Sequence, residues 1–366
     1  MACESQQPKK NENHFYAIKI HFLGAFIFAF ASPLFASDPF VNGITSYSNQ
    51  KYDEALKMFA SAAEDGDGGG INNVGVLYFN GQGVKSDDTN AFEQFKRASE
   101  QGLASAQFNF AMMHQFGHGT PKNLGEAVKW YSASAKQGLP QAQYNLATMH
   151  IKGEGTPSNP QEGERLLQLA SNQKFIRAKY ALGVFYQAGF LGTPNYSEAI
   201  KYFNEAASLG SSQAKAAMGY LYAEGLGVAK NLENAFKWYQ AAAKDADVDG
   251  YFGEAYMLQN GFGVSKNLMA AKAGYETAIQ LNHTNAMVNL GIMFAQGLGV
   301  EKDDSKAISY YRQAADAGNG EGMLRLAFMY EQGRGVEKDM LQAKYWYKKS
   351  ADSGNSETLK IFPTLP

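Results

Sequence analysis

Three Ser-x-x-Lys motifs are the residues of this 366-residue sequence that could supply a serine nucleophile and a lysine base. In penicillin-recognising serine enzymes, Lys-Thr-Gly and Ser-Asp-Asn motifs complete such a site. Neither companion motif occurs here, and the three serines fall at helix ends or unit boundaries without a shared pocket. We therefore predict that the chain is not an enzyme. The motifs are Ser48…Lys51, Ser171…Lys174 and Ser212…Lys215.

The histidines offer a second kind of chemistry, because histidines four residues apart on a helix can bind a metal ion. His114 and His118 have this spacing, and His150 follows His114 by 36 residues. No third ligand lies near them in sequence, and the position of His114 and His150 holds Tyr or Phe in most other copies of the repeat described below. We therefore predict aromatic substitutes in a core, with no metal and no cofactor.

Recurrent Gly-x-Gly turns could suggest a phosphate loop, but their spacing indicates a structural role. A phosphate loop joins a strand to a helix, whereas each of these turns joins two predicted helices. Eight such turns occur. In seven of them the first glycine opens a Gly-x-Gly, and the fourth turn reads Gly189-Phe-Leu-Gly192. A constant period of this length predicts a tandem array of helical hairpins. The first glycines, always 36 residues apart, are Gly81, Gly117, Gly153, Gly189, Gly225, Gly261, Gly297 and Gly333.

Each 36-residue unit carries the signals of two helices. Before the turn, Ala106, Phe110, Ala111 and His114 illustrate an i, i+4, i+5, i+8 pattern that marks one face of a first helix. The Ala111 position is Ala or Gly in all eight copies, which allows two helices to cross closely. An unbroken Asp/Asn position, six residues after the first glycine, predicts the N-cap of a second helix.

The pattern Ala-x-x-x-Leu-Gly-x-x-Tyr-x-x-Gly-x-Gly-Val, then Asp/Asn, Ala, Trp-Tyr and Ala-Ala, resembles the Sel-one-like repeats, relatives of tetratricopeptide repeats. The segment from Gly219 to Tyr239 is a close match. The resemblance implies an all-α, right-handed α/α superhelical solenoid of eight 36-residue helix-turn-helix repeats over residues 67–354. We expect residues 37–66 to cap the array, because Tyr52–Asp65 looks like a second helix without its first. Residues 355–366 would form a C-terminal tail.

A partner-binding surface is expected on the first helices, along a stripe spaced i, i+3, i+7 and i+10. The resemblance to peptide-binding tetratricopeptide proteins also implies an asparagine ladder that contacts the backbone or terminal carboxylate of a peptide in the first three copies. The alternative for these asparagines is that they form hydrogen bonds within the fold. We expect substitution of these asparagines to weaken partner capture without lowering the melting temperature. The alternative is that the stripe packs against the neighbouring hairpin. The predicted residues are Asn73, Asn109, Asn145, Phe108, Met112, Tyr144, Tyr180, Tyr220, Phe252 and Tyr256.

The N-terminal 36 residues read as a secretory signal peptide. Lys9, Lys10 and Lys19 precede an apolar run, Phe22–Phe30, and small residues then lead to a cleavage site after Ala36, with Ala31 as the alternative. An uncleaved anchor is a second alternative, and the chain would contact a membrane only in that case. The sole cysteine, Cys3, lies in this segment, so an exported chain would hold no disulfide.

The composition narrows the class of partner. The formal net charge is −2, whereas phosphate-backbone binding needs a basic surface, so we predict no nucleic-acid partner. The sequence favours a monomeric, non-catalytic scaffold, periplasmic or secreted, that binds a protein or peptide on the concave face of its solenoid. Envelope regulation or host interaction would be its setting. The alternative function is a β-lactam or cell-wall hydrolase, as described for some relatives of this repeat family.

Overall fold

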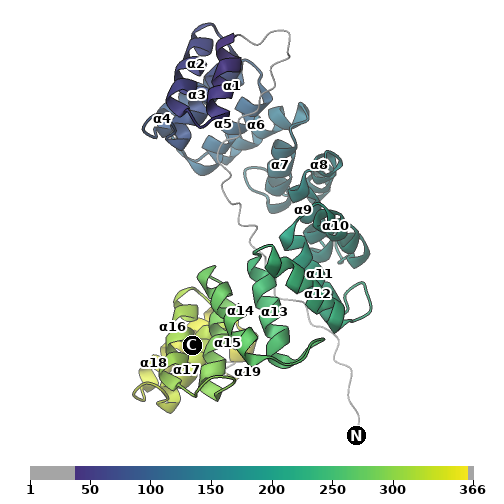
Figure 1. Cartoon of the computed structure of the whole chain (residues 1–366), viewed down its shortest axis with the longest axis vertical. Coiled ribbons are helices and arrows are strands. Elements are labelled where there is room, and N and C mark those ends of the chain that lie inside the picture. The colour runs from purple at the N-terminus through teal and green to yellow at the C-terminus, as the bar shows by residue number, and fades with distance from the viewer. Residues whose placement is uncertain (1–37, 362–366) are drawn as a thin grey trace. The chain divides into compact units, whose positions relative to one another are not determined.

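The structure, a computed structural model, describes residues 38–361, and all of its elements there are α-helices (Figure 1). Within each of two compact units, the helices pair into successive hairpins, and each hairpin packs on the next along the chain. The all-α repeat architecture predicted from the sequence is therefore confirmed. The predicted signal segment and the last five residues of the tail lie outside the described residues.

The hairpins consist of a first helix, here called helix A, and a second helix, helix B. The A helices are α1 Asp38–Ser48, α3 Gly68–Asn80, α5 Ala104–Phe116, α7 Pro140–Lys152, α9 Ile176–Ala188, α11 Ser212–Glu224, α13 Val248–Asn260, α15 Thr284–Gln296 and α17 Gly320–Gln332. The B helices are α2 Tyr52–Glu64, α4 Asp88–Glu100, α6 Leu124–Lys136, α8 Pro160–Asn172, α10 Tyr196–Ser208, α12 Leu232–Lys244, α14 Leu268–Gln280, α16 Asp304–Asp316 and α18 Met340–Asp352. A short helix, α19 Ser356–Ile361, follows the last hairpin.

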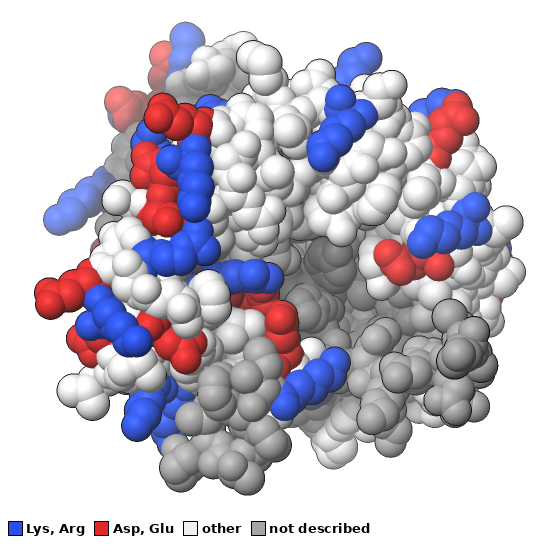
Figure 2. All heavy atoms as spheres, turned by 90° about the horizontal axis from the view of Figure 1, so that it is seen from below, with Lys and Arg blue, Asp and Glu red and all other residues white. Residues whose placement is uncertain are grey.

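The described helices form two compact units, residues 38–202 and residues 203–361, which divide within α10. Many charged side chains on their surfaces pair within one helix, such as Lys272 with Glu276 at 2.6 Å and Lys237 with Glu233 at 2.7 Å. In the face seen in Figure 2, most Lys and Arg side chains lie beside Asp or Glu side chains. Basic side chains therefore form no continuous area in that view.

The predicted caps start and stop the helices. Asn123 Oδ1 accepts a hydrogen bond from the Glu126 amide at 3.1 Å, which satisfies a free donor in the first turn of α6. At the other end of the A helices, the first glycine of each turn adopts the left-handed conformation, as Gly117 does with φ 77°. The full set of Asp/Asn caps bonds first-turn amides in the same way: Asp87, Asn123, Asn159, Asn195, Asn231, Asn267, Asp303 and Asp339.

The second glycine of the turn has a separate function, because it docks one hairpin on the preceding one. A Cβ on Gly119 would lie 2.2 Å from the carbonyl oxygen of Asp88, the first residue of the previous helix B. Gly155 approaches Leu124 and Gly335 approaches Asp304 in the same manner. Only glycine fits this contact. The Gly-x-Gly is thus a helix stop followed by a site of contact between hairpins.

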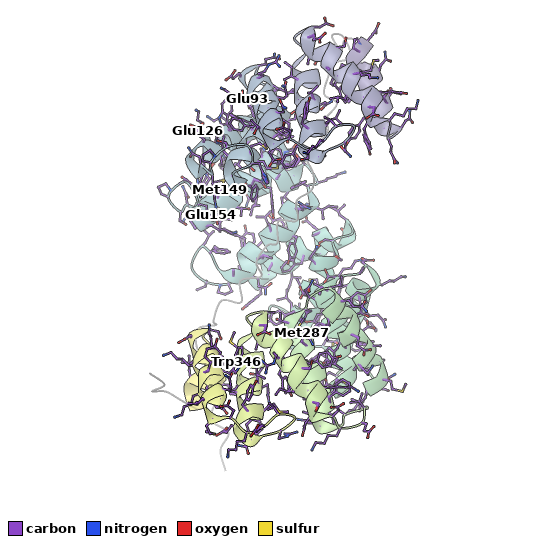
Figure 3. The ribbon with its side chains drawn as sticks, turned by 90° about the vertical axis from the view of Figure 1, so that its left-hand side faces the viewer. Glu93, Glu126, Met149, Glu154, Met287 and Trp346 are labelled. Carbon is purple, nitrogen blue, oxygen red and sulfur yellow. The ribbon has the colours of Figure 1, made fainter. Side chains whose placement is uncertain are left out.

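In hairpins whose helix B keeps a buried aromatic residue, the core joins a small residue of helix A to that ring; α8 has Leu166 and Leu167 instead. A Cβ on Gly75 would lie 2.8 Å from the ring of Phe95, and one on Gly291 would lie 2.6 Å from Tyr311. The close crossing predicted from the Ala/Gly position is therefore present. Long apolar side chains such as Met149 of α7 fill the remaining interior, while Glu126 of α6 lies at the surface (Figure 3).

The N-terminal end holds one helix more than the sequence pattern predicted. Residues 37–66 were expected to supply a second helix alone, whereas α1 precedes α2 and packs Phe40 against Phe59, with ring centroids 5.9 Å apart. Gly43 lies against Phe59, 16 residues later, whereas Gly75 lies against Phe95, 20 residues later. The connection in this hairpin is therefore four residues shorter and lacks the Gly-x-Gly, which is why the 36-residue period missed it.

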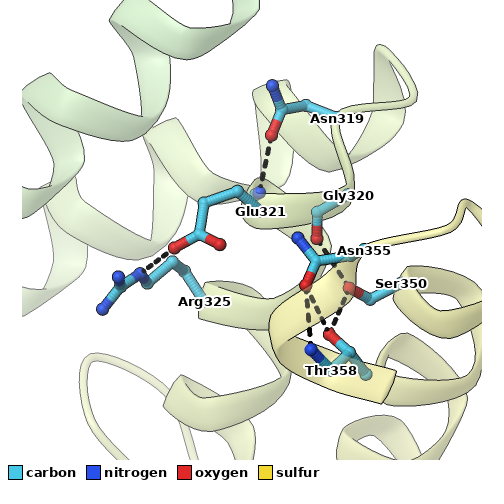
Figure 4. Close-up of polar contacts among 8 residues, drawn as sticks. Asn319, Gly320, Glu321, Arg325, Ser350, Asn355 and Thr358 are labelled. Atoms are coloured by element: carbon cyan, nitrogen blue, oxygen red, sulfur yellow. Dashed lines mark hydrogen bonds and ion pairs between the residues drawn. The ribbon is translucent and has the colours of Figure 1, made fainter. Parts of the chain in front are cut away.

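The C-terminal tail starts a further helix A in the same register. Helix α19 begins at Ser356, 36 residues after the start of α17, and Asn355 Oδ1 caps it by accepting from the Thr358 amide at 2.9 Å (Figure 4). Thr358 is fully buried, and its hydroxyl lies 2.7 Å from that of Ser350, which donates to Gly320 O. The described part of the tail, residues 355–361, therefore packs on the last hairpin.

Among the described helices, none combines the length and the apolar character needed to cross a bilayer.

Candidate partner-binding surface

The asparagines predicted to form a peptide ladder lie largely inside the fold. Asn73 and Asn109 are 1 % and 0 % exposed, and Asn145 is half-buried. Asn109 Nδ2 donates to Asn72 Oδ1 at 2.9 Å, and Asn72 Nδ2 donates to Asn73 Oδ1 at 3.2 Å. The expected access of a peptide to Asn73 and Asn109 is therefore wrong for this structure. The amides of Asn72, Asn73 and Asn109 instead pair with one another inside the fold.

The third asparagine is part of a hydrogen-bond relay between hairpins. Tyr131 of α6 donates to Gln115 Oε1 of α5 at 2.8 Å and accepts from Asn145 Nδ2 of α7 at 3.0 Å. Burial raises the pKa of the Tyr131 hydroxyl well above its ordinary value, so the hydroxyl remains a donor. The relay thus joins three consecutive helices and gives Asn145 a structural partner.

The same relay recurs in the second unit. Tyr275 of α14 donates to Gln259 Oε1 at 2.7 Å and accepts from Asn289 Nδ2 at 3.1 Å. The sequence analysis missed this link, although the three residues keep the spacing of Gln115, Tyr131 and Asn145. That shared spacing was the available signal.

The predicted apolar stripe is buried in the first copies and opens in the later ones. Phe108, Met112 and Tyr144 are 5–6 % exposed, so in these copies the stripe packs inside the fold. Tyr180 and Phe252 are half-buried. Tyr256, in contrast, is 44 % exposed. The accessible part of the predicted surface therefore belongs to the unit of residues 203–361, and not to copies one to three.

Four side chains at one repeat position form what we call the aromatic strip: Tyr220 of α11, Tyr256 of α13, Ile292 of α15 and Phe328 of α17. Tyr256 and Phe328 are each 44 % exposed, and Tyr220 and Ile292 are half-buried. The 36-residue period places all four at one repeat position, and the two tyrosines were among the predicted site residues.

Polar side chains border the aromatic strip on the same helix face. The residue four positions after each strip residue is polar and exposed, and these four residues form one polar row. The residue seven positions before each strip residue is also polar, and these four form a second polar row. Amides offer both donors and acceptors, which a peptide backbone can use. The following row is Glu224, Asn260, Gln296 and Gln332, and the preceding row is Gln213, Asp249, Asn285 and Glu321.

Ring contacts hold part of this surface in place. Phe252 stacks on His283 with centroids 4.3 Å apart, and His283 Nε2 lies 3.4 Å from Asp249 Oδ1. Tyr256 packs edge-on against Phe262 at 6.0 Å. These contacts restrict the rotamers of Phe252 and Tyr256, so a ligand would meet a preformed apolar surface.

The serine motifs do not form nucleophile–base pairs. Ser48 Oγ donates to Ile44 O at 2.9 Å, and Ser212 Oγ donates to Asp247 Oδ2 at 3.1 Å. Ser171 Oγ accepts from Lys179 at 3.3 Å, and Lys179 is outside the motif. Within residues 38–361 no hydrogen bond joins any of the three serines to its motif lysine, so nothing there favours the hydrolase alternative.

The histidines lie among aromatic rings. His114 packs edge-on against Phe92 and Phe110, with centroids 5.4 and 4.7 Å away, and burial lowers the pKa of its imidazole. His118 Nδ1 lies 2.9 Å from Asp88 Oδ2. No group of three or more His, Cys, Asp or Glu in the described part of the chain is arranged to hold a metal ion. His114 therefore occupies an aromatic core position.

The 36-residue period of the chain matches that of a known repeat family. A model of the Sel1 repeat family matches nine times, over residues 42–67, 70–103, 104–139, 140–175, 176–211, 212–247, 250–283, 284–319 and 320–355. The chain belongs to the Sel1 repeat family. Its first repeat is the α1–α2 hairpin, so the family model adds one repeat to the eight predicted from glycine spacing. Repeats of this family are protein-interaction scaffolds, which gives the coarse functional class.

Two solved structures show the same Sel1 repeat architecture. A protective antigen of uropathogenic Escherichia coli shares 32 % identity with a TM-score of 0.66, covering 84 % of this chain and 67 % of the antigen. A Sel1 repeat protein from Oxalobacter formigenes shares 24 % identity with a TM-score of 0.61, covering 90 % and 94 %. No protein in the curated comparison matches the sequence.

Proposed function

We propose that this Sel1 repeat chain is a non-catalytic scaffold that binds an extended peptide segment of a protein partner along the aromatic strip. The observation that carries the proposal is the 44 % exposure of both Tyr256 and Phe328 at one repeat position. Large aromatic side chains supply most of the affinity at protein interfaces. An extended segment can lie across several A helices and contact one strip residue on each.

The polar rows make a peptide a better occupant than a purely apolar ligand. Asn260 and Gln296 lie one helical turn beyond Tyr256 and Ile292 and are exposed. Their amides can pair with the backbone of an extended segment, which would otherwise lose hydrogen bonds to water on binding. The strip would thus supply apolar contacts, and the rows would satisfy the backbone.

We further propose that the scaffold is exported and works as a monomer. The lysines and apolar run of the N-terminal segment support export. The Escherichia coli relative is described as a protective antigen. That description supports host interaction, and not envelope regulation, as the proposed setting.

Peptide selection tests the strip. Peptides selected on the full chain from a random display library should bind the Tyr256→Ala/Phe328→Ala variant at least about tenfold more weakly, since each aromatic anchor contributes about 1–2 kcal/mol. Isothermal titration calorimetry measures this change. Leu191→Ala is a matched control, because Leu191 is 47 % exposed on a loop of the other unit. Equal affinity for the wild type and the double variant would place the peptide site elsewhere.

A further inference from the structure

The last helix B carries an exposed apolar patch on the face that points away from its hairpin. Leu341 is 80 % exposed, Tyr345 is 50 % exposed and Met340 is 45 % exposed. These three residues are called the α18 patch below. Exposed apolar side chains gathered at one place usually mark a contact surface, whereas single ones need no explanation.

The α18 patch is not a general feature of the repeat. The position of Leu341 holds Glu233 in α12 and Ser305 in α16. The position of Tyr345 holds Lys237 in α12 and Ser309 in α16. Because these polar residues sit in the same kind of helix B, the hairpin does not need apolar side chains at either place.

Lysines surround the α18 patch. Leu341, Tyr345 and Lys348 follow an i, i+4, i+7 line along one helix face, and Lys344 and Lys349 flank that line. All three lysines are exposed, and Lys349 Nζ lies 5.7 Å from the centre of the Tyr345 ring. Asp352 is the one acidic residue of α18, which leaves the helix with a formal charge of +2.

We propose that the α18 patch binds the surface of an anionic lipid bilayer. Apolar tips on an exposed helix face can enter the boundary between headgroups and acyl chains, while lysines extend from their apolar stems to lipid phosphates. Tyrosine is a common residue at that depth. This surface contact is separate from the aromatic strip, and it does not require a membrane-spanning segment.

The charge of the lysines favours an anionic bilayer over a second copy of the chain as the binding partner of the α18 patch. A symmetric contact between two α18 patches would bring Lys344, Lys348 and Lys349 of both copies together, and like charges oppose such a contact. A bilayer with anionic headgroups instead pairs every lysine with an opposite charge, and each lysine near such a surface strengthens binding about fivefold. Complementary charge therefore selects the lipid surface.

Vesicle sedimentation of the full chain tests the proposal. Wild-type protein should partition onto vesicles of phosphatidylcholine mixed with the anionic lipid phosphatidylglycerol more strongly than onto vesicles of phosphatidylcholine alone. The Leu341→Ser/Tyr345→Ser variant carries the two serines that α16 has at the same repeat positions, so it should keep the fold. The partition coefficient of this variant onto the anionic vesicles should be at least about tenfold lower than that of the wild type. Lys344→Gln/Lys348→Gln/Lys349→Gln should lower it by up to about 100-fold.

Met269→Ser is the matched control. Met269 occupies the Leu341 position in α14 and is 79 % exposed, but the single lysine of α14, Lys272, pairs with Glu276. This variant should bind anionic vesicles as the wild type does. Every variant keeps the apolar N-terminal run, so differences between them report on α18. Equal partition coefficients for wild type and both α18 variants would overturn the proposal. So would lysine-dependent self-association of the chain without lipid.

Discussion

Buried polar side chains determine where a ligand can bind at the scale of single residues. The sequence predicted that Asn73, Asn109 and Asn145 form a ladder for a peptide. In the structure, however, Asn145 Nδ2 donates to the Tyr131 hydroxyl at 3.0 Å, and Asn109 is fully buried. A buried amide that loses its partner costs free energy, and a surface amide costs little. These asparagines therefore hold hairpins together, and their substitution should affect stability first.

Asn145→Ala should lower the free energy of unfolding by about 1–3 kcal/mol, because it removes one partner of the buried Tyr131 hydroxyl. Urea denaturation followed by circular dichroism measures the change. Asn80→Ala is the control, since Asn80 lies exposed at the end of α3. This expectation replaces the sequence-based one that such substitutions leave the melting temperature unaltered. An unchanged urea midpoint for Asn145→Ala would contradict the relay.

At the scale of elements, glycines with different backbone conformations have opposite effects on stability. Gly117 ends α5 with φ 77°, a conformation that L-residues adopt at a cost. Gly125 lies in the first turn of α6, and a Cβ there would meet only Asn123 Oδ1, at 3.5 Å. The turn between α5 and α6 therefore requires Gly117, whereas Gly125 can be replaced by a residue with a side chain.

Gly117→Ala should destabilise the chain by about 1–2 kcal/mol, while Gly125→Ala should stabilise it by about 0.5–1 kcal/mol. Both substitutions add one methyl group to the same hairpin, so each serves as the control for the other. Urea unfolding curves give the two signs. If both variants shifted in the same direction, the different conformations of the two glycines would not be the cause.

At the scale of the whole molecule, the hairpins that stack within each of the two compact units present a repeated surface of A and B helices. Within each compact unit, a hairpin contacts its neighbours in sequence, so stability and surface are both built repeat by repeat there. The two apolar surfaces argued above, the aromatic strip and the α18 patch, lie on different helices of the unit of residues 203–361. A scaffold of this kind can hold a peptide and a membrane surface at once.

Export is also tested on the whole molecule. Expressed in a bacterium with its own N-terminus, the chain should reach the periplasm with the intact mass of a protein that starts at Ser37. Mass spectrometry of the periplasmic and membrane fractions measures this. A full-length mass in the membrane fraction would instead indicate an uncleaved anchor.

The period of 36 residues, together with cap and turn residues, was enough to predict the all-helical repeat architecture. Local chemistry determines these features, because Asn123 caps and Gly117 stops a helix wherever the chain lies. The sequence pattern did not predict α1, because the short connection between α1 and α2 uses Gln50, with φ 60°, where the later repeats use glycine. A residue that takes a left-handed conformation without being glycine gives no signal in sequence.

Exposure was decided only by the tertiary structure. Met112 and Tyr256 occupy the same repeat position, and the sequence treats them alike, yet they are 5 % and 44 % exposed. Met112 packs in a cluster with Val76, Phe95 and Phe110, and such packing is a sum over many side chains and not a property of one position. The sequence by itself determined which side chains share a helix face, and packing between hairpins decided which of them a partner can reach.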